Sequence, residues 1–288
     1  MSLRKKRNGI LLVFVFLVII ICIVSLILLL SPIEQTTISK AVKPVITTVP
    51  NTDRDTLNVD VEKVERVISD NYNSVFEGAI GEQNISMAIY RHGNQLTASY
   101  ITQEDADGEV NLTGSIQIDT ASITLYSENN NITLKGIIKP NTADGELLEG
   151  TYTASGTGEE TTFTLALSHT IGNTIEERYP YINTNTLDVE EFARKIKSYV
   201  IEDKKKEFAA LVVYPIMVTI NDTKVSISNS EEFEKYYEEI INAHLKERIT
   251  SSYTKYLNGN EMGVMMGYGE VWFDNWKDQG LRIIAINN

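Results

Sequence analysis

Cysteine and histidine are scarce in this sequence, and their scarcity excludes several classes of site. The single cysteine, Cys22, lies in an apolar run near the N-terminus, so the rest of the chain has no disulfide framework and no thiolate ligands. The three histidines, His92, His169 and His244, have no second His or Cys nearby at ligand spacing. We expect no metal site, and we predict that His92 and His169 are exposed residues without a role.

Basic residues are also few, and they are unevenly placed. The chain of 288 residues has a formal net charge of −13, and outside the first eight residues 22 basic residues face 39 acidic ones. A surface this acidic repels phosphate backbones, so nucleic acid is not expected as a partner. Glycine-rich phosphate loops followed by lysine are absent, and no cofactor is predicted. Asp105, Asp107 and Glu109 resemble part of a calcium loop, but their spacing favours a polar hairpin turn.

One long apolar run is present, over residues 10–30. Its 21 uncharged residues give a helix about 31 Å long, close to the roughly 30 Å of a bilayer core. The run lacks the small residues of a signal-peptide cleavage site, and the basic tail 1–9 favours a cytoplasmic N-terminus. The sequence therefore predicts an uncleaved single-pass anchor in the cell membrane. The lipid bilayer is the expected partner of residues 10–30, with the bulk of the chain extracytoplasmic.

The segment 31–71 joins the predicted anchor to the folded part. Residues 31–56 are rich in Thr, Ser, Pro and Val and have no helical period, which is typical of an extended tether. Over 58–70, valine and isoleucine recur at helical spacing. This pattern predicts a short amphipathic helix.

Short alternating segments separated by polar turns fill residues 72–170. The candidate strands are 74–80, 85–91, 95–103, 110–118, 122–128, 132–139, 147–154 and 161–168. This spacing predicts an antiparallel β-meander, either a small barrel or a strongly curled sheet. Two of its motifs, Asn111-Leu112-Thr113-Gly114 and Thr133-Leu134-Lys135-Gly136, are similar to β-meander modules of exported bacterial proteins. A barrel can hold a small apolar ligand, and the alternative is a filled core.

A junction at 170–186 separates this meander from a region of mixed pattern, 187–288. The predicted elements are helices within 187–213, a hairpin over 216–227, a helix over 233–245 and terminal strands over 264–274 and 281–286. Gly267 and Gly269 predict a bulge or sharp bend within the longer strand. The large apolar residues of the terminal strands should carry the stability of this region: Trp272, Phe273, Ile283, Ile284 and Ile286.

The order of these elements resembles the nuclear transport factor 2-like cone. The resemblance rests on that order and on the segments Tyr214-Pro215-Ile216, Gly269-Glu270-Val271-Trp272-Phe273 and Ile283-Ile284-Ala285-Ile286-Asn287. It implies a curled sheet around an N-terminal helix, with a mouth that holds a substrate in ketosteroid isomerases and dehydratases. The expected fold class is an N-terminal transmembrane helix followed by an all-β antiparallel meander or barrel and an α+β cone-shaped domain.

Four residues form a candidate pocket in the predicted cone: Glu270, His244, Tyr214 and Trp272. Glu270 is the one acid in a predicted apolar strand, and a carboxylate lining an apolar cone has a raised pKa and can act as acid or base. Alternation places Glu270 on the face of Trp272, which points inward or outward depending on the bend at Gly267. His244 is either a packing residue at the rim of a helix or a general base.

The sequence favours a membrane-anchored binding or interaction protein without catalytic activity. No grouping of Ser, His and Asp at recognisable spacing is present, and no residue is assigned as catalytic. The expected partner is an extracellular protein, lipid or glycan. One alternative is a cone-fold enzyme of the isomerase or dehydratase type that acts on a small exported metabolite. Another is lipid or glycan binding by the β-meander.

Overall fold

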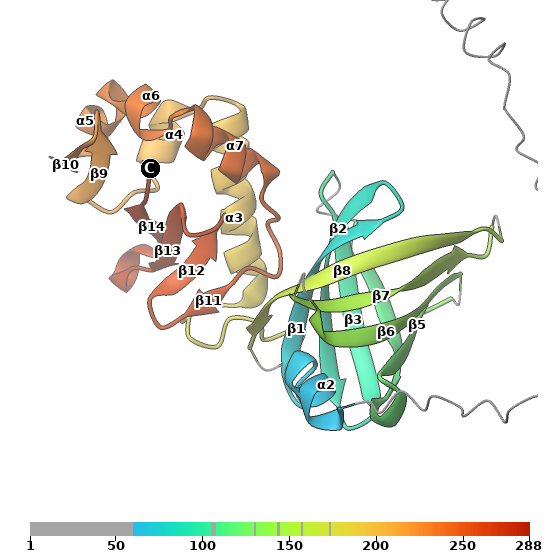
Figure 1. Cartoon of the computed structure of the whole chain (residues 1–288). Coiled ribbons are helices and arrows are strands. Elements are labelled where there is room, and N and C mark those ends of the chain that lie inside the picture. The colour runs from blue at the N-terminus through green and yellow to red at the C-terminus, as the bar shows by residue number, and fades with distance from the viewer. Residues whose placement is uncertain (1–59, 105–107, 130, 143–144, 157, 173) are drawn as a thin grey trace, which may run out of the picture. The chain divides into compact units, whose positions relative to one another are not determined.

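The computed structural model describes residues 60–288, apart from 105–107, 130, 143–144, 157 and 173. The described residues all belong to one compact unit, Thr56–Asn288. Along the chain, a short helix and a β-barrel come first, and short helices with two small sheets follow (Figure 1).

Eight antiparallel strands close into a barrel, with each strand paired to the next and β8 paired to β1. They are β1 (Asn73–Ile80), β2 (Gln83–His92), β3 (Gln95–Thr102), β4 (Val110–Gln117), β5 (Ser122–Ser127), β6 (Ile132–Thr142), β7 (Gly145–Ala154) and β8 (Glu160–Ile171), with a 3₁₀ turn η1 (Ile118–Thr120) before β5. Alternation decides which face each side chain takes. In β4, Leu112 and Ile116 are buried while the polar residues between them are exposed or half-buried.

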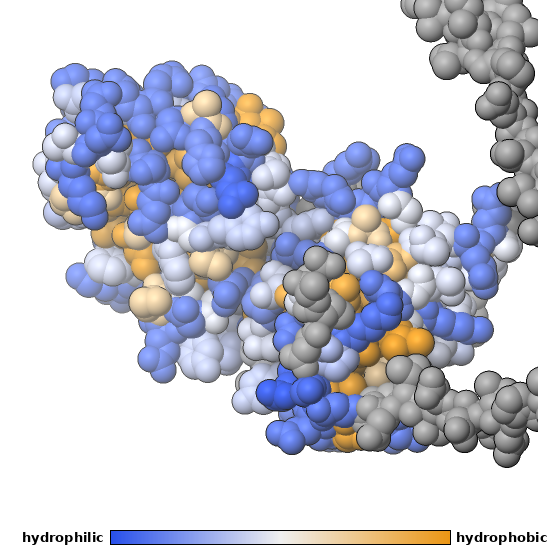
Figure 2. All heavy atoms as spheres, in the orientation of Figure 1, coloured by the Kyte–Doolittle hydropathy of each residue, from blue (hydrophilic) through white to orange (hydrophobic). Residues whose placement is uncertain are grey.

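Side chains fill the interior of this barrel. Phe76, Met87 and Phe163 are among its buried residues. Helix α2 (Val61–Val67) adds Val64 and Val67 to the same core. The barrel interior is therefore a packed hydrophobic core. On the face shown in Figure 2, hydrophilic side chains predominate and hydrophobic ones form scattered areas.

The C-terminal part combines short helices with two small sheets. Its helices are α3 (Thr186–Ile201), α4 (Lys205–Ala209), α5 (Ser230–Lys235), α6 (Tyr237–Ile240) and α7 (Ala243–Ser251). Its strands are β9 (Ile216–Ile220), β10 (Thr223–Ile227), β11 (Gly259–Asn260), β12 (Gly263–Met266), β13 (Val271–Asn275) and β14 (Leu281–Ile286), with a 3₁₀ turn η2 (Lys277–Gln279) between the last two. Strands β9 and β10 pair as a hairpin, and β11 to β14 form a separate four-stranded antiparallel sheet.

Helix α3 packs on the four-stranded sheet. It begins after Asn185, whose side chain accepts a hydrogen bond from the backbone N–H of Asp188 and so caps the helix. Its buried face includes Phe192, and the ring centroid of Phe192 lies 5.1 Å from that of Phe273 in β13. Packing of such large apolar residues provides the core of the C-terminal part.

The chain reverses where the sequence predicts one continuous strand over 264–274. Gly267 and Gly269 have φ angles of 73° and 106°, a region that favours glycine. A Cβ at Gly267 would lie 2.2 Å from Oε2 of Glu270. The segment therefore folds into the β12–β13 hairpin, with the chain reversal at the glycines where a bulge or sharp bend within one strand was predicted. The predicted helix over 233–245 is likewise divided, into α5, α6 and the start of α7.

The predicted fold class is therefore wrong. The described chain is mostly β, its barrel is closed, and its C-terminal strands form two separate sheets where a cone needs one curled sheet. The short helices and the glycine turn after β12 break the long elements that the cone requires. No described helix is long and apolar enough to cross a bilayer. The predicted transmembrane segment 10–30 and most of the tether 31–71 lie outside the described residues, so the transmembrane description is not supported.

Candidate functional site

A small apolar area on the outer wall of the barrel is covered by two tyrosines. Val75 of β1, Ala88 of β2 and Ile101 of β3 are buried in a cluster separate from the barrel core. Tyr256 is fully enclosed in this cluster, and Tyr253 packs against it. The segment that follows α7 is thereby held against the barrel wall through contacts that exclude water from both surfaces.

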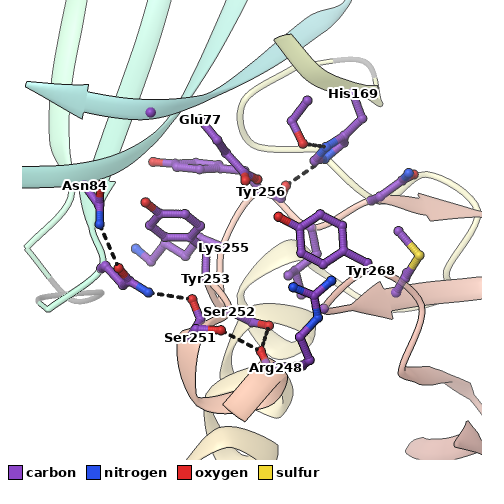
Figure 3. A pocket seen from close by; sticks show the side chains of 17 residues that line it. Glu77, Asn84, His169, Arg248, Ser251, Ser252, Tyr253, Lys255, Tyr256 and Tyr268 are labelled. Atoms are coloured by element: carbon purple, nitrogen blue, oxygen red, sulfur yellow. Dashed lines mark hydrogen bonds between the residues drawn. The ribbon is translucent and has the colours of Figure 1, made fainter. Parts of the chain in front are cut away.

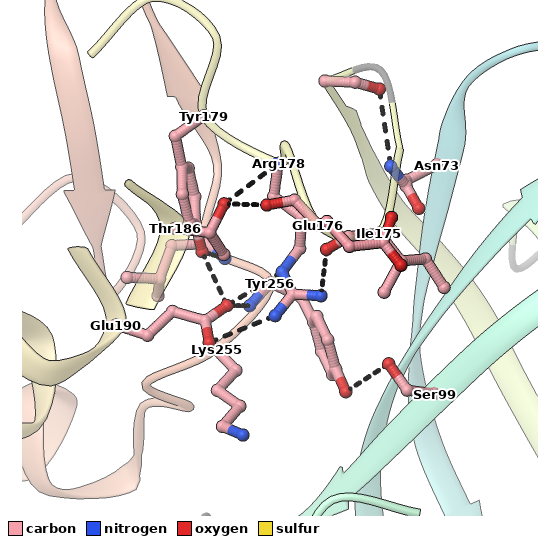
Figure 4. A network of polar contacts seen from close by, with 12 residues as sticks. Asn73, Ser99, Ile175, Glu176, Arg178, Tyr179, Thr186, Glu190, Lys255 and Tyr256 are labelled. Atoms are coloured by element: carbon pink, nitrogen blue, oxygen red, sulfur yellow. Dashed lines mark hydrogen bonds and ion pairs between the residues drawn. The ribbon is translucent and has the colours of Figure 1, made fainter. Parts of the chain in front are cut away.

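A buried ion pair between Arg178 and Glu190 lies next to this segment (Figure 4). Nε and Nη2 of Arg178 donate to the two carboxylate oxygens of Glu190 at 2.9 and 3.2 Å, and the two side chains are only 4% and 2% exposed. The Tyr179 hydroxyl donates to Glu190 at 3.3 Å and accepts from the backbone N–H of Leu257 at 3.0 Å. Burial raises the pKa of Glu190 even though Arg178 acts in the opposite direction. Bidentate pairing fixes the position of both groups.

The same network reaches the barrel through Glu109, which lies just before β4. Lys255 donates to its Oε2 at 2.5 Å, and the Tyr256 hydroxyl lies 2.9 Å from its Oε1 and 2.8 Å from the Ser99 hydroxyl. The guanidinium of Arg178 lies 5.0 Å from the centre of the Tyr256 ring. Burial opposes ionisation of Glu109, but the hydrogen bond from Lys255 and the nearby cations hold its pKa below the usual range. Two cations and two carboxylates thus balance in this network.

Beside this network lies a pocket of about 540 Å³ (Figure 3). The barrel contributes Glu77 of β1, Asn84 of β2 and His169 of β8, and the C-terminal part contributes Arg248, Tyr253 and Tyr268. This volume falls within the roughly 300–1,000 Å³ of small-ligand sites. Polar and charged side chains form most of its lining, together with the rings of Tyr253, Tyr256 and Tyr268, so the pocket can hold a molecule with both a flat or apolar part and a polar group.

The charged side chains of this pocket differ in how far they are neutralised. Nε of Arg248 donates to Oε1 of Glu270 at 3.0 Å, and its guanidinium lies 4.0 Å from the centre of the Tyr268 ring. Lys255 is paired with Glu109. Among the described residues, Glu77 has no cationic partner; its carboxyl interacts with the Ser168 hydroxyl. Burial raises the pKa of Glu77 by more than this hydrogen bond lowers it.

His169 lines the pocket in a fixed, neutral form. Its Nε2 lies 2.9 Å from the backbone oxygen of Tyr256, and its Nδ1 lies 3.0 Å from the Ser168 hydroxyl. Since a carbonyl oxygen only accepts, Nε2 carries a proton and donates it to the Tyr256 carbonyl. Burial lowers the pKa of His169 to about 4, against the opposing effect of the Tyr256 carbonyl. The prediction that His169 is an exposed residue without a role is wrong.

The four candidate pocket residues from the sequence do not come together. His244 is exposed near the start of α7. The Tyr214 hydroxyl donates to the backbone oxygen of Ala209 at 2.8 Å, so it is used within the C-terminal core. Trp272 is half-buried in β13, opposite Met265. These three residues lie in different elements and do not line the pocket.

Glu270 is the one sequence candidate that lies beside the pocket, through its contact with Arg248. Burial would raise the pKa of Glu270, but the hydrogen bonds from Arg248 and from the Tyr268 backbone N–H hold it below the usual value. The carboxylate also closes the turn between β12 and β13. Glu270 therefore serves as the partner of Arg248, and its pKa is lowered, whereas an apolar cone would raise it.

Sequence reasoning missed Glu77, Tyr253, Tyr268 and the contribution of Arg248. A signal for Glu77 was available, because it is the one charged residue within β1, the same criterion that selected Glu270. No comparable signal marked the tyrosines, which line a pocket with Glu77 only when the chain after α7 packs on the barrel. Among the described residues, no group of three or more His, Cys, Asp or Glu is placed to hold a metal ion.

Comparison with known proteins yields no relative: no family model, no curated protein and no solved structure matches the chain. The resemblances to the nuclear transport factor 2-like family and to exported β-meander modules therefore stay untested predictions. The functional argument rests on the pocket itself.

Proposed function

We propose that this protein is a binding protein that holds a small ligand, or the terminal group of a larger partner, in the pocket lined by Glu77, Tyr253 and Tyr268. The observation that carries the proposal is the pocket of about 540 Å³, whose wall is kept in place by the buried network of Arg178 and Glu190. A preorganised wall favours binding because little ordering is left to be done when the ligand arrives.

Binding without chemistry is favoured because the pocket's proton-transfer groups are already engaged. Both ring nitrogens of His169 have hydrogen-bond partners, and Glu270 is held by Arg248. Burial raises the pKa of Tyr253 and of Tyr256, so both remain neutral phenols. A general acid or base must instead be free to exchange a proton with the substrate.

A second candidate function is catalysis with Glu77 as general acid or base. It is favoured by one observation: burial raises the pKa of this carboxyl inside the pocket. The nearest titratable group linked to it, His169, reaches Glu77 only through the Ser168 hydroxyl, and its Nε2 is held by the Tyr256 carbonyl. We therefore rank catalysis below binding.

The test is a thermal-shift screen of the full chain with amines, sugars, organic acids and short peptides. A ligand present at about 100 times its Kd should stabilise the native state by about 2.7 kcal/mol. Tyr268→Ala should remove this stabilisation, while Tyr126→Ala should retain it, because Tyr126 lies outside the pocket on β5. Tyr268 and Tyr126 are 76% and 40% exposed, so neither truncation should disturb the fold.

Two results would contradict the proposal. If a ligand stabilises Tyr268→Ala as strongly as the unaltered protein, it binds elsewhere. If mass spectrometry shows that the ligand is converted during incubation, and Glu77→Gln stops the conversion, the protein is an enzyme.

A further inference from the structure

We infer that the pocket selects ligands that carry an organic cation, an ammonium or guanidinium group, held by the carboxylate of Glu77 against the rings of Tyr253 and Tyr268. The inference rests on the proposed binding function and specifies the chemistry of its ligand. It follows from the charges, the aromatic surfaces and the helix end that meet at the pocket.

The first argument is the balance of charge in the lining. The two cations of the lining, Arg248 and Lys255, already pair with Glu270 and Glu109 at 3.0 and 2.5 Å. Burial lowers the pKa of His169 to about 4, so its ring is neutral near pH 7. Glu77 is then the one charged group of the described lining without an opposite charge. A half-buried carboxylate in that position is stabilised by a cation that enters the pocket.

The second argument is the placement of the tyrosine rings. Figure 3 shows Glu77 on the barrel side, with Tyr253 and Tyr268 projecting into the same space from the C-terminal part. Burial raises the pKa of Tyr253, and the nearby Glu77 and Tyr268 raise it further, so both groups lie close to the Tyr253 ring. Aromatic faces attract cations through the ring quadrupole, and a carboxylate beside them adds a direct charge partner.

The third argument is that the surroundings disfavour an anion. Arg248 is the group that would bind an anion, but Glu270 neutralises it and its guanidinium is stacked on Tyr268. Helix α7 ends at Ser251, which lines the pocket, and the C-terminal end of a helix is electronegative. The net charge of −13 adds a long-range attraction for cations.

The test uses three probes of similar size and different charge: benzylamine, benzyl alcohol and benzoate. Ligand-observed NMR titration of the full chain should give the highest affinity for benzylamine. Glu77→Gln should weaken benzylamine binding at least tenfold and leave benzyl alcohol nearly unaffected. The matched control is Glu128→Gln, which changes the net charge equally at an exposed site outside the pocket lining. Glu77→Asp keeps the charge and should retain more affinity than Glu77→Gln.

The outcomes separate this inference from the proposed function. If benzyl alcohol or benzoate binds as tightly as benzylamine and Tyr268→Ala abolishes that binding, the binding function stands and the cation selectivity is overturned. If benzylamine does not bind, or binds Glu77→Gln as tightly as the unaltered protein, the inference is also overturned, and the thermal-shift screen decides separately on the binding function. Circular dichroism of each variant shows that it is folded before its affinity is compared.

Discussion

Replacing Arg178 with methionine tests whether the buried network holds the pocket wall. Arg178→Met keeps the length of the side chain but removes both hydrogen bonds to Glu190 and the one from Nη1 to the Ile175 carbonyl at 2.5 Å. Removing one partner of a buried ion pair typically costs about 3–5 kcal/mol, because the other charge is left without compensation. We expect a loss of this size in the free energy of unfolding near pH 7.5.

The pH dependence of this loss identifies its cause. Without Arg178 the pKa of Glu190, already raised by burial, should rise further. The folded variant then binds a proton that the unfolded chain releases, so its stability falls as pH rises, by up to about 1.4 kcal/mol per pH unit. The loss should therefore be smaller at pH 5 than at pH 7.5. Arg178→Met with Glu190→Gln removes the orphaned charge and should recover about 2 kcal/mol.

Urea unfolding of the full chain, followed by the fluorescence of Trp272 and Trp276, measures these differences. If Arg178→Met unfolds at the same urea concentration as the unaltered protein, the pair contributes nothing to stability. If the loss is equal at pH 5 and pH 7.5, or if Glu190→Gln adds to it, an uncompensated charge on Glu190 is not its cause.

Two further changes test the site and the core. Burial lowers the pKa of His169 to about 4, so from pH 6.5 down to 4 the unfolded chain binds a proton that the native state does not, and the free energy of unfolding falls by about 3 kcal/mol. His169→Gln should remove this part of the pH dependence in urea titrations. If the free energy of unfolding of the variant changes with pH as steeply as that of the unaltered protein, His169 is not its cause. Phe273 is fully buried and Trp272 is half-buried. Phe273→Ala should therefore lower the free energy of unfolding by about 3–5 kcal/mol, and Trp272→Ala by roughly half that or less. Equal decreases in the urea midpoint would contradict the assignment of Phe273 to the core.

The strands of the barrel could be located from the sequence because alternation and turn residues are local signals. The prediction over 85–91 falls within β2, Gln83–His92, and the prediction over 110–118 nearly coincides with β4, Val110–Gln117. Closure into a barrel could not be predicted, since it depends on the pairing of β1 with β8 at opposite ends of the meander. The filled interior likewise follows from which residues meet after closure.

The C-terminal strands show how a local pattern can mislead. Apolar residues on both sides of Gly267 and Gly269 predicted one strand with a bulge or sharp bend, because the apolar composition resumes after the glycines. The two positive φ angles turn the chain back on itself instead. Trp272 then points to a half-buried face and Phe273 to the core, so the two aromatic residues that were predicted together to stabilise this region are buried to different extents.

The segment 170–186 illustrates the limit of reading linkers from composition. Its Gly, Asn and Thr content indicated a junction, but Arg178 and Tyr179 within it are buried and bind Glu190. A single arginine in a polar stretch has no pattern of its own. Its role appears only when the barrel residue Glu109 and the C-terminal residue Tyr256 lie next to it.

The pocket and the buried network share residues, and this sharing would link the proposed ligand binding to the stability of the network. Lys255 and Tyr256 line the pocket and also contact Glu109, while His169 touches the backbone of Tyr256 from the pocket side. A ligand at Glu77 would therefore contact a pocket wall, formed by Lys255 and Tyr256, whose position is fixed by the ion pairs of the network. Because the native state alone presents that wall, binding and the network stabilise the same arrangement of the barrel and the segment after α7.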